Sequence, residues 1–181
     1  NLRNLPDINV YALDLPGHGQ SRGAGRKHVE AYADFTDSFV SELNLRNVTL
    51  AGHSLGGAIV QTLALRSPKW LTRIILVGTG ARLRVTSAIL DGLLSDFEKT
   101  IDIICDYAYG PYASESLIQQ GREGLLKNKP ELIHGDYSAC NQFDIMDQVK
   151  QITVHSLIVS ADADKLTPLK YGQYLHRNIQ N

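Results

Sequence analysis

Ser54 lies at the centre of Gly52-His53-Ser54-Leu55-Gly56, a Gly-x-Ser-x-Gly pattern that suits nucleophilic chemistry. The pattern alone is modest support, because so short a match also arises by chance. Here residues 48–51 (Val-Thr-Leu-Ala) are typical of a short strand, and the run from about 55 to 66 is typical of a helix. A strand, a sharp turn and a helix in this order form the setting of a nucleophile elbow. The pattern therefore predicts that Ser54 is a nucleophile.

The predicted elbow also supplies groups that would assist the serine. Gly52 and Gly56 are expected to keep side chains out of the crowded turn. The start of a helix has unpaired N–H groups and the positive end of the helix dipole, which favour a developing oxyanion. We expect the N–H of Leu55 to be one oxyanion donor. The alternative is that the glycines form only a tight turn and that Ser54 caps the helix.

A serine hydroxyl also needs a base to accept its proton and an acid to orient that base. Asp162 and Asp164 follow the last predicted strand, in a loop that ends at Pro168, so either carboxylate could reach the active-site edge. The alternative for both aspartates is a role in capping the next helix.

None of the six histidines is well placed as the base. His53 is inside the elbow and is expected to point away from the serine. His18, in a Pro-Gly-His-Gly turn, is expected to be a hydrogen-bonded turn residue. His176 is expected on a helix, so its use as the base is a remote alternative. The other three are expected at surface positions or at the start of a helix or strand: His28, His134 and His155.

Hydrophobic periodicity predicts the elements that position these residues. Strands are expected at 8–13, 48–51, 74–77 and 155–160, and helices at about 28–43, 55–66 and 169–179. Residues 83–150 have helical periodicity and no strand pattern, so they are expected to form a helical insertion. This alternation predicts an α/β fold with a mostly parallel sheet, right-handed crossovers and helices on both faces. Loops 14–23, 52–57 and 160–168 then follow strands at the edge where such sheets bind ligands.

Three motifs in this order resemble the α/β-hydrolase superfamily of esterases, lactonases and carbon–carbon bond hydrolases. They are residues 14–21 (Asp-Leu-Pro-Gly-His-Gly-Gln-Ser), residues 52–57 (Gly-His-Ser-Leu-Gly-Gly) and the loop at Asp164. The Asp-x-x-x-Pro spacing of Asp164 matches the family pattern, so the resemblance favours Asp164 as the acid and leaves Asp162 to cap or satisfy the loop. A serine at position 54, where a carboxylate would otherwise stand, argues against the epoxide hydrolase and haloalkane dehalogenase branches.

The resemblance also implies parts that this sequence does not contain. It implies three strands before residue 8, with a His-Gly loop that gives the second oxyanion donor, and one strand after residue 180 followed by the catalytic histidine. The chain is therefore expected to be an incomplete α/β-hydrolase whose catalytic histidine is unknown. The expected domains are a hydrolase core at 1–82 and 151–181 and a helical cap at 83–150.

The resemblance implies a serine hydrolase that acts on a small ester, lactone or related carbonyl substrate through an acyl-enzyme. This activity is expected of the full-length parent, and the 181-residue chain itself is expected to be a poor catalyst. The alternative is a non-catalytic, hydrolase-like protein that binds a small molecule and lacks the base. Five aromatic residues of the insertion could line an amphipathic pocket or simply pack between helices: Tyr107, Tyr109, Tyr112, Tyr137 and Phe143.

Composition excludes several other classes. The 181 residues are 43% hydrophobic and 20% charged with a net charge of −1, so no basic surface for nucleic acid is expected. No window has the roughly 18 apolar residues of a membrane span. Cys105 and Cys140 lack metal-ligand spacing, and no Gly-x-Gly-x-x-Gly follows the first strand, so no metal or cofactor is expected. The partner is then a small-molecule substrate, and the default location is cytoplasmic.

Overall fold

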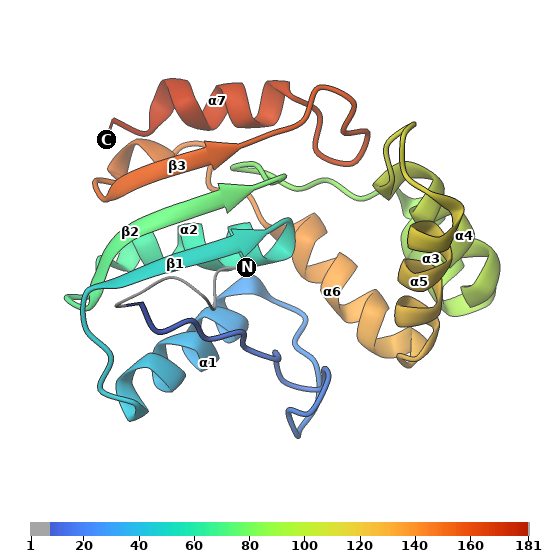
Figure 1. Ribbon diagram of the computed structural model, residues 1–181, viewed down its shortest axis with the longest axis horizontal. Coiled ribbons are helices and arrows are strands. Elements are labelled where there is room, and N and C mark those ends of the chain that lie inside the picture. Colours follow the sequence, from blue (N-terminus) through green and yellow to red (C-terminus); the bar gives the residue numbers. More distant parts are fainter. Residues whose placement is uncertain (1–7, 181) are drawn as a thin grey trace.

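A computed structural model describes residues 8–180 (Figure 1). Its elements along the chain are α1 (Val29–Glu42), β1 (Val48–His53), α2 (Leu55–Arg66), β2 (Leu71–Val77), α3 (Ser87–Ser95), α4 (Phe97–Ala108), α5 (Glu115–Leu126), α6 (Pro130–Gln142), the short 3₁₀-helix η2 (Val149–Gln151), β3 (His155–Val159) and α7 (Lys170–Asn178). The predicted helices at 28–43, 55–66 and 169–179 are confirmed, as are the strands at 48–51, 74–77 and 155–160, and no end differs by more than three residues.

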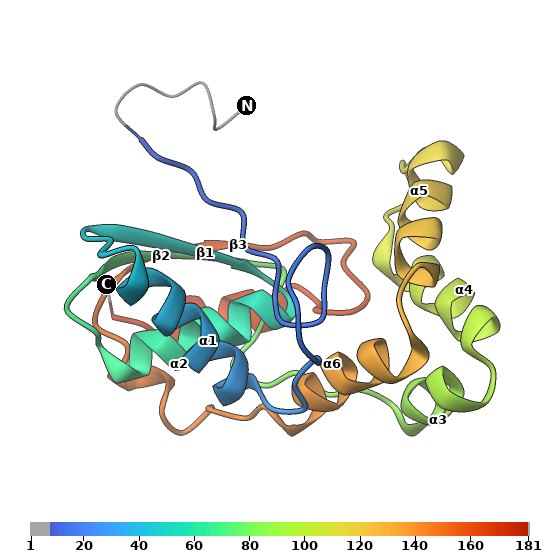
Figure 2. The same cartoon turned by 90° about the horizontal axis from the view of Figure 1, so that it is seen from below.

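The three strands form one parallel sheet in the order β1-β2-β3. The register pairs His53 with Val77 and Val77 with Val159, so the carboxyl ends of all three strands meet at one edge. Successive parallel strands in spatial order, joined by right-handed crossovers, put their connecting helices on the same face. Figure 2 shows α1 and α2 on one side of the sheet, and Leu175 of α7 packs in the same core as α2.

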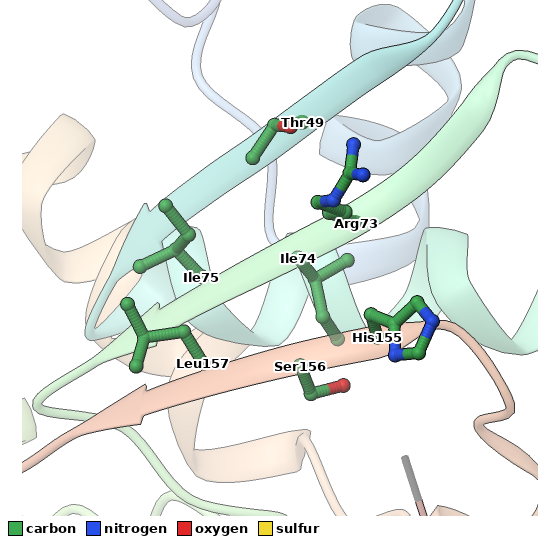
Figure 3. A pocket seen from close by; sticks show the side chains of 7 residues that line it. All are labelled: Thr49, Arg73, Ile74, Ile75, His155, Ser156 and Leu157. Carbon is green, nitrogen blue, oxygen red and sulfur yellow. The ribbon is translucent and has the colours of Figure 1, made fainter.

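The two faces of the sheet differ in burial. Ile74 and Leu76 of β2 point toward α2 and are 1% and 0% exposed. On the other face, Leu157 and Val159 of β3 are 55% and 44% exposed, and Leu157 lies beside Ile75 (Figure 3). The expectation of helices on both faces is therefore met on only one face among residues 8–180. The apolar run in β2 reflects its central position in the sheet.

Residues 8–13, which were expected to form a strand, have no regular structure. A strand needs a neighbour that accepts and donates its backbone hydrogen bonds. In the described chain β1 pairs only with β2, and no strand lies beside residues 8–13. Ile8, Val10 and Tyr11 are correspondingly exposed, by 43–57%. The β-propensity of the segment is therefore not realised.

Helices α3–α6 fill most of residues 83–150, as expected, and α3, α4 and α5 lie beyond the carboxyl ends of the strands (Figure 1). Leu93, Ile101, Ile104 and Cys105 form a small apolar cluster there, separate from the main core. Helix α6 joins the two clusters. Its amino-terminal part contributes Ile133 to the small cluster, whereas Ala139 and the following Phe143 pack in the main core. The insertion is thus attached to the sheet layer through α6.

Candidate active site

Ser54 occupies a strained turn between β1 and α2. Its backbone has φ 51° and ψ −115°, a conformation that costs a non-glycine residue about 1–3 kcal/mol unless its surroundings hold it. Those surroundings are hydrogen bonds on both sides of the residue. The Ser54 N–H donates to the Val77 carbonyl (3.0 Å), and the Ser54 carbonyl accepts from the Gly57 N–H (2.9 Å). The predicted strand–turn–helix geometry around Ser54 is therefore present.

The side chain of Ser54 does not cap α2. Although Ser54 is the residue that precedes the helix, its hydroxyl accepts no hydrogen bond from the first turn. Ser54 is half-buried, and its hydroxyl makes no hydrogen bond within the described chain. The N–H of Leu55, the first residue of α2, also has no acceptor among the described residues. A free hydroxyl thus lies next to a free donor at a helix N-terminus, the arrangement that stabilises an oxyanion.

The glycines around Ser54 have different surroundings. A Cβ on Gly52 would lie 2.1 Å from the Gly56 carbonyl oxygen, so only glycine fits there. A Cβ on Gly56 would meet nothing within 4 Å, and the expectation that Gly56 avoids a collision is wrong. Gly57 is the second position where a side chain would collide, because a Cβ there would lie 2.5 Å from the Thr79 methyl group. The backbone of α2 at Gly56 therefore lies against Gly52 of β1, and Gly57 lies against Thr79 in the loop after β2.

Asp164 lies in the loop after β3 and organises that loop. One carboxylate oxygen accepts from the backbone N–H groups of Leu166 (2.9 Å) and Thr167 (2.7 Å), and the other accepts from the Thr167 hydroxyl (2.7 Å). The role of satisfying the loop, expected for Asp162, thus belongs to Asp164. Asp162 is exposed and makes no hydrogen bond within the described chain.

Gly78, directly after β2, brings the Asp164 loop close to the elbow. Its N–H donates to the Val159 carbonyl (2.9 Å), and its φ of +49° turns the chain at the edge of the sheet. A Cβ on Gly78 would lie 3.5 Å from an Asp164 carboxylate oxygen and 3.2 Å from the His53 ring. The carboxylate and the end of β1 therefore flank the same residue.

No histidine within residues 8–180 is hydrogen-bonded to Asp164. His155 begins β3, and His176 lies in the last turn of α7, so both are at the opposite edge of the sheet (Figure 1). The ring of His53 lies over Gly78 beside Asp164 without bonding to it. Among the described residues, Asp164 therefore has no histidine bonded to it.

His18 is the hydrogen-bonded turn residue that was expected, and its shortest hydrogen bond is to a residue far away in sequence. Its Nδ1 is 3.2 Å from the Pro16 carbonyl, and its Nε2 is 2.7 Å from the Asp136 carboxylate of α6. The Tyr32 hydroxyl of α1 donates to the same carboxylate (2.5 Å) and accepts from the Arg26 N–H (2.8 Å). This network ties the 14–27 loop and α1 to α6.

Burial dominates the electrostatics of this network. It raises the pKa of Asp136 above 3.8, against the lowering effects of the hydrogen bond from Tyr32 and of His18. Burial together with the bond to Asp136 raises the pKa of the Tyr32 phenol well above 10. Nothing in the sequence near Asp136 indicated this partner, because the pair is 118 residues apart.

The aromatic residues of the insertion divide into two groups. Tyr109 and Tyr137 pack against the small apolar cluster, and Phe143 is buried in the main core at 4% exposure. Tyr107 and Tyr112 are exposed, by 47% and 100%. Packing between helices therefore accounts for three of the five aromatic residues.

Three further observations delimit the site. Within residues 8–180, no cluster of three or more His, Cys, Asp or Glu side chains could hold a metal ion. No helix in the same range is long and apolar enough to cross a membrane. A shallow hollow lined by Thr49, Arg73, Ile75, His155 and Leu157 lies on the open sheet face, away from the Ser54 edge (Figure 3).

A family model described as the α/β hydrolase fold matches residues 2–103. The chain belongs to the α/β hydrolase fold family. A solved thermophilic esterase is 36% identical to this α/β hydrolase, with a TM-score of 0.85, over 98% of this chain and 71% of that one. A pimeloyl-[acyl-carrier protein] methyl ester esterase from Vibrio campbellii is 25% identical over 96% of this chain and 73% of its own length. An enol-lactonase from Burkholderia xenovorans, 19% identical with a TM-score of 0.85 over 92% of this chain and 67% of that one, shares the fold.

Proposed function

We propose that the protein is a serine esterase in which Ser54 is the nucleophile and Asp164 is the acid. The observation that carries the proposal is that the Ser54 hydroxyl makes no hydrogen bond in the described chain. It lies in a strained turn beside the Leu55 N–H, which also has no acceptor there. A serine that served only as a helix cap would use its hydroxyl on the first turn of α2, and this one does not. The esterases among the relatives support the same chemistry.

In the proposed reaction the Ser54 oxygen attacks the ester carbonyl carbon and its proton passes to a base. The carbonyl oxygen becomes an oxyanion that accepts a hydrogen bond from the Leu55 N–H. Collapse of this intermediate breaks the ester C–O bond, the alcohol leaves with the proton, and water then hydrolyses the acyl-enzyme. Asp164 orients the base through the carboxylate edge that lies beside Gly78.

The base in this proposal is a histidine, and none of the described histidines is assigned to it. The matched relatives are longer than this chain, which covers 71–73% of the first two compared above. Tests of activity therefore use the full-length protein. We also propose that residues 83–150 act as a cap, because α3, α4 and α5 lie beyond the strand ends where Ser54 and Asp164 are found (Figure 1).

The proposed substrate is a small carboxylic ester or lactone. Ser54 and Asp164 lie at the strand ends that face α3–α5, so the insertion would determine which acyl groups fit. The name of the Vibrio relative specifies a pimeloyl-[acyl-carrier protein] methyl ester, so this ester is one to include in a panel.

The test is hydrolysis of p-nitrophenyl esters and of pimeloyl-[acyl-carrier protein] methyl ester by the full-length protein and its Ser54→Ala variant. We expect turnover by the wild type and loss of at least about 10⁴-fold in the variant. Ser38→Ala, on α1 and away from the strand edge, is the matched control and should retain activity. Equal turnover by wild type and Ser54→Ala would refute the proposal.

A non-catalytic, small-molecule-binding hydrolase relative is the second candidate. The observation that favours it is that the hydrogen bonds of Asp164 all come from its own loop, with no histidine attached in the described chain. It predicts that the full-length protein hydrolyses none of the esters but binds one of them, as measured by calorimetry. The same panel of esters therefore distinguishes the two candidates.

A further inference from the structure

Thr79 is a buried residue of the loop after β2 whose hydroxyl contacts the elbow directly. It is 2% exposed, and its Oγ1 donates to the Ser54 carbonyl at 2.9 Å. The absence of a side chain at Gly57 makes room for this approach, since a Cβ there would lie 2.5 Å from the Thr79 methyl group. The contact joins the strained serine to an element 25 residues further along the chain.

The carbonyl that Thr79 holds belongs to the same peptide unit as the Leu55 N–H. The chain has no cis peptide bond in its described part, so this unit is trans and planar. In a trans peptide the C=O and the N–H point in opposite directions. A bond that fixes the Ser54 carbonyl therefore also fixes the direction of the proposed oxyanion donor.

The hydrogen bond from Thr79 to the Ser54 carbonyl has a second effect on the Leu55 N–H. A hydrogen bond to a carbonyl polarises the amide, which makes its N–H a stronger donor. The Ser54 carbonyl accepts from Gly57 N–H (2.9 Å) and Ala58 N–H (3.2 Å) as well as from Thr79. Three donors thus act on one peptide at the nucleophile.

The loop that carries Thr79 is itself held in place. The Gln61 amide group donates to the carbonyls of both Gly57 and Gly80, each at 3.0 Å, and so links α2 to the residue after Thr79. On the other side, the Gly78 N–H donates to the Val159 carbonyl at 2.9 Å. Hydrogen bonds therefore hold the residues on both sides of Thr79, Gly78 and Gly80, and so fix the position of Thr79 relative to Ser54.

From this geometry we propose that Thr79 is a positioning residue for ester hydrolysis, one that orients and polarises the Ser54–Leu55 peptide so that the Leu55 N–H meets the oxyanion. The proposal rests on the proposed role of Ser54. The simpler alternative is that Thr79 only satisfies its own buried hydroxyl, with no effect on the reaction.

The test compares Thr79→Val, which keeps the shape and removes the hydroxyl, with Thr79→Ser, which keeps the hydroxyl, in the full-length protein. The Ser54 carbonyl retains two backbone donors in Thr79→Val, so the variant is expected to fold. Active sites are counted by fluorophosphonate titration, and kcat and KM are measured per titrated site. We expect Thr79→Val to lower kcat roughly tenfold with KM within about twofold, and Thr79→Ser to recover most of kcat.

A matched pair of oxoester and thionoester substrates gives a readout that a purely structural role would not change. Sulfur accepts hydrogen bonds weakly, so the thionoester gains less from the Leu55 donor. The loss in Thr79→Val should be clearly smaller on the thionoester. Unchanged kcat, no recovery in Thr79→Ser, or equal losses on both substrates would overturn the proposal for Thr79 alone. A wild type that neither titrates nor hydrolyses either ester would overturn the proposed function, and the role of Thr79 with it.

Discussion

Gly52 and Gly56 are both two residues from Ser54, but only one of them needs to be glycine. A Cβ on Gly52 would lie 2.1 Å from the backbone oxygen of Gly56, whereas a Cβ on Gly56 would meet nothing within 4 Å. We expect Gly52→Ala to displace the elbow and reduce ester hydrolysis by at least about 100-fold. Gly56→Ala should retain activity within about threefold and raise the free energy of unfolding by up to about 1 kcal/mol, because alanine is the better helix former. Kinetics and urea unfolding of both variants check this, and comparable losses in the two would contradict it.

Replacing each aspartate with asparagine tests whether Asp164 or Asp162 is the catalytic acid. In Asp164→Asn the remaining carbonyl oxygen can still accept from Leu166 and Thr167, so the loop is expected to persist while the negative charge is lost. We expect kcat to fall by roughly 10³–10⁴-fold, as for other triad acids. Asp162→Asn is the control and should leave kcat within about twofold, because Asp162 is exposed. Steady-state kinetics of the full-length variants decide between the two residues, and a greater loss in Asp162→Asn would assign the acid to Asp162.

At the scale of elements, the Asp136 network should make stability depend on pH. Burial raises the pKa of Asp136 above 3.8 in the folded protein, so the folded state binds this proton more tightly than the unfolded state does. Its contribution to the free energy of unfolding is then most favourable below pH 3.8 and decreases as pH rises through the raised pKa. His18 and Tyr32 are the groups that face the carboxyl from the other elements.

The variant Asp136→Asn removes this titration. Between about pH 4 and pH 6, we expect the stability of the wild type relative to Asp136→Asn to decrease with increasing pH. Urea unfolding at several pH values measures the difference. Asp91→Asn, at an exposed position of α3, is the control and should show no such trend. A relative stability of the wild type that rises over this range would show that the partners of Asp136 outweigh its burial.

At the scale of the whole molecule, the open face of the sheet exposes apolar side chains to solvent. Leu157 and Val159, two residues apart in β3, are 55% and 44% exposed. Exposed apolar patches promote association, so the 181-residue chain, expressed alone, should self-associate with increasing concentration. Replacing both residues with threonine should reduce the association. Leu94→Thr, at a 56% exposed position of α3, should not. Light scattering measures the association of the wild type, the double variant and Leu94→Thr. A wild-type chain that remains monomeric would contradict the prediction.

The sequence was sufficient for features that depend on local pattern. The Gly-x-Ser-x-Gly turn, helix α2 and the loop at Asp164 all follow from short-range spacing and flanking periodicity. It was insufficient where partners decide the outcome. Residues 8–13 have strand propensity but no neighbouring strand in the described chain, and β2 has an apolar run but a helical layer on one face only.

Hydrogen bonds between residues far apart in sequence could not be predicted from local sequence patterns either. The bonds of His18 to Asp136 and of Thr79 to Ser54 join residues 118 and 25 positions apart, and neither pair has a local spacing to reveal it. Local spacing also did not predict that a side chain would collide at Gly57 and not at Gly56. This difference depends on where the loop after β2, which contains Thr79, passes over α2. Such contacts follow only from the packed arrangement of the elements.

The central claim is that Ser54 is the nucleophile, and covalent labelling tests it most directly. The full-length protein is treated with a fluorophosphonate, and the modified peptide is identified by mass spectrometry. We predict a single adduct on the peptide that contains Ser54, abolished in Ser54→Ala and retained in Ser38→Ala. An adduct that persists in Ser54→Ala, or that maps to another serine, would contradict the assignment.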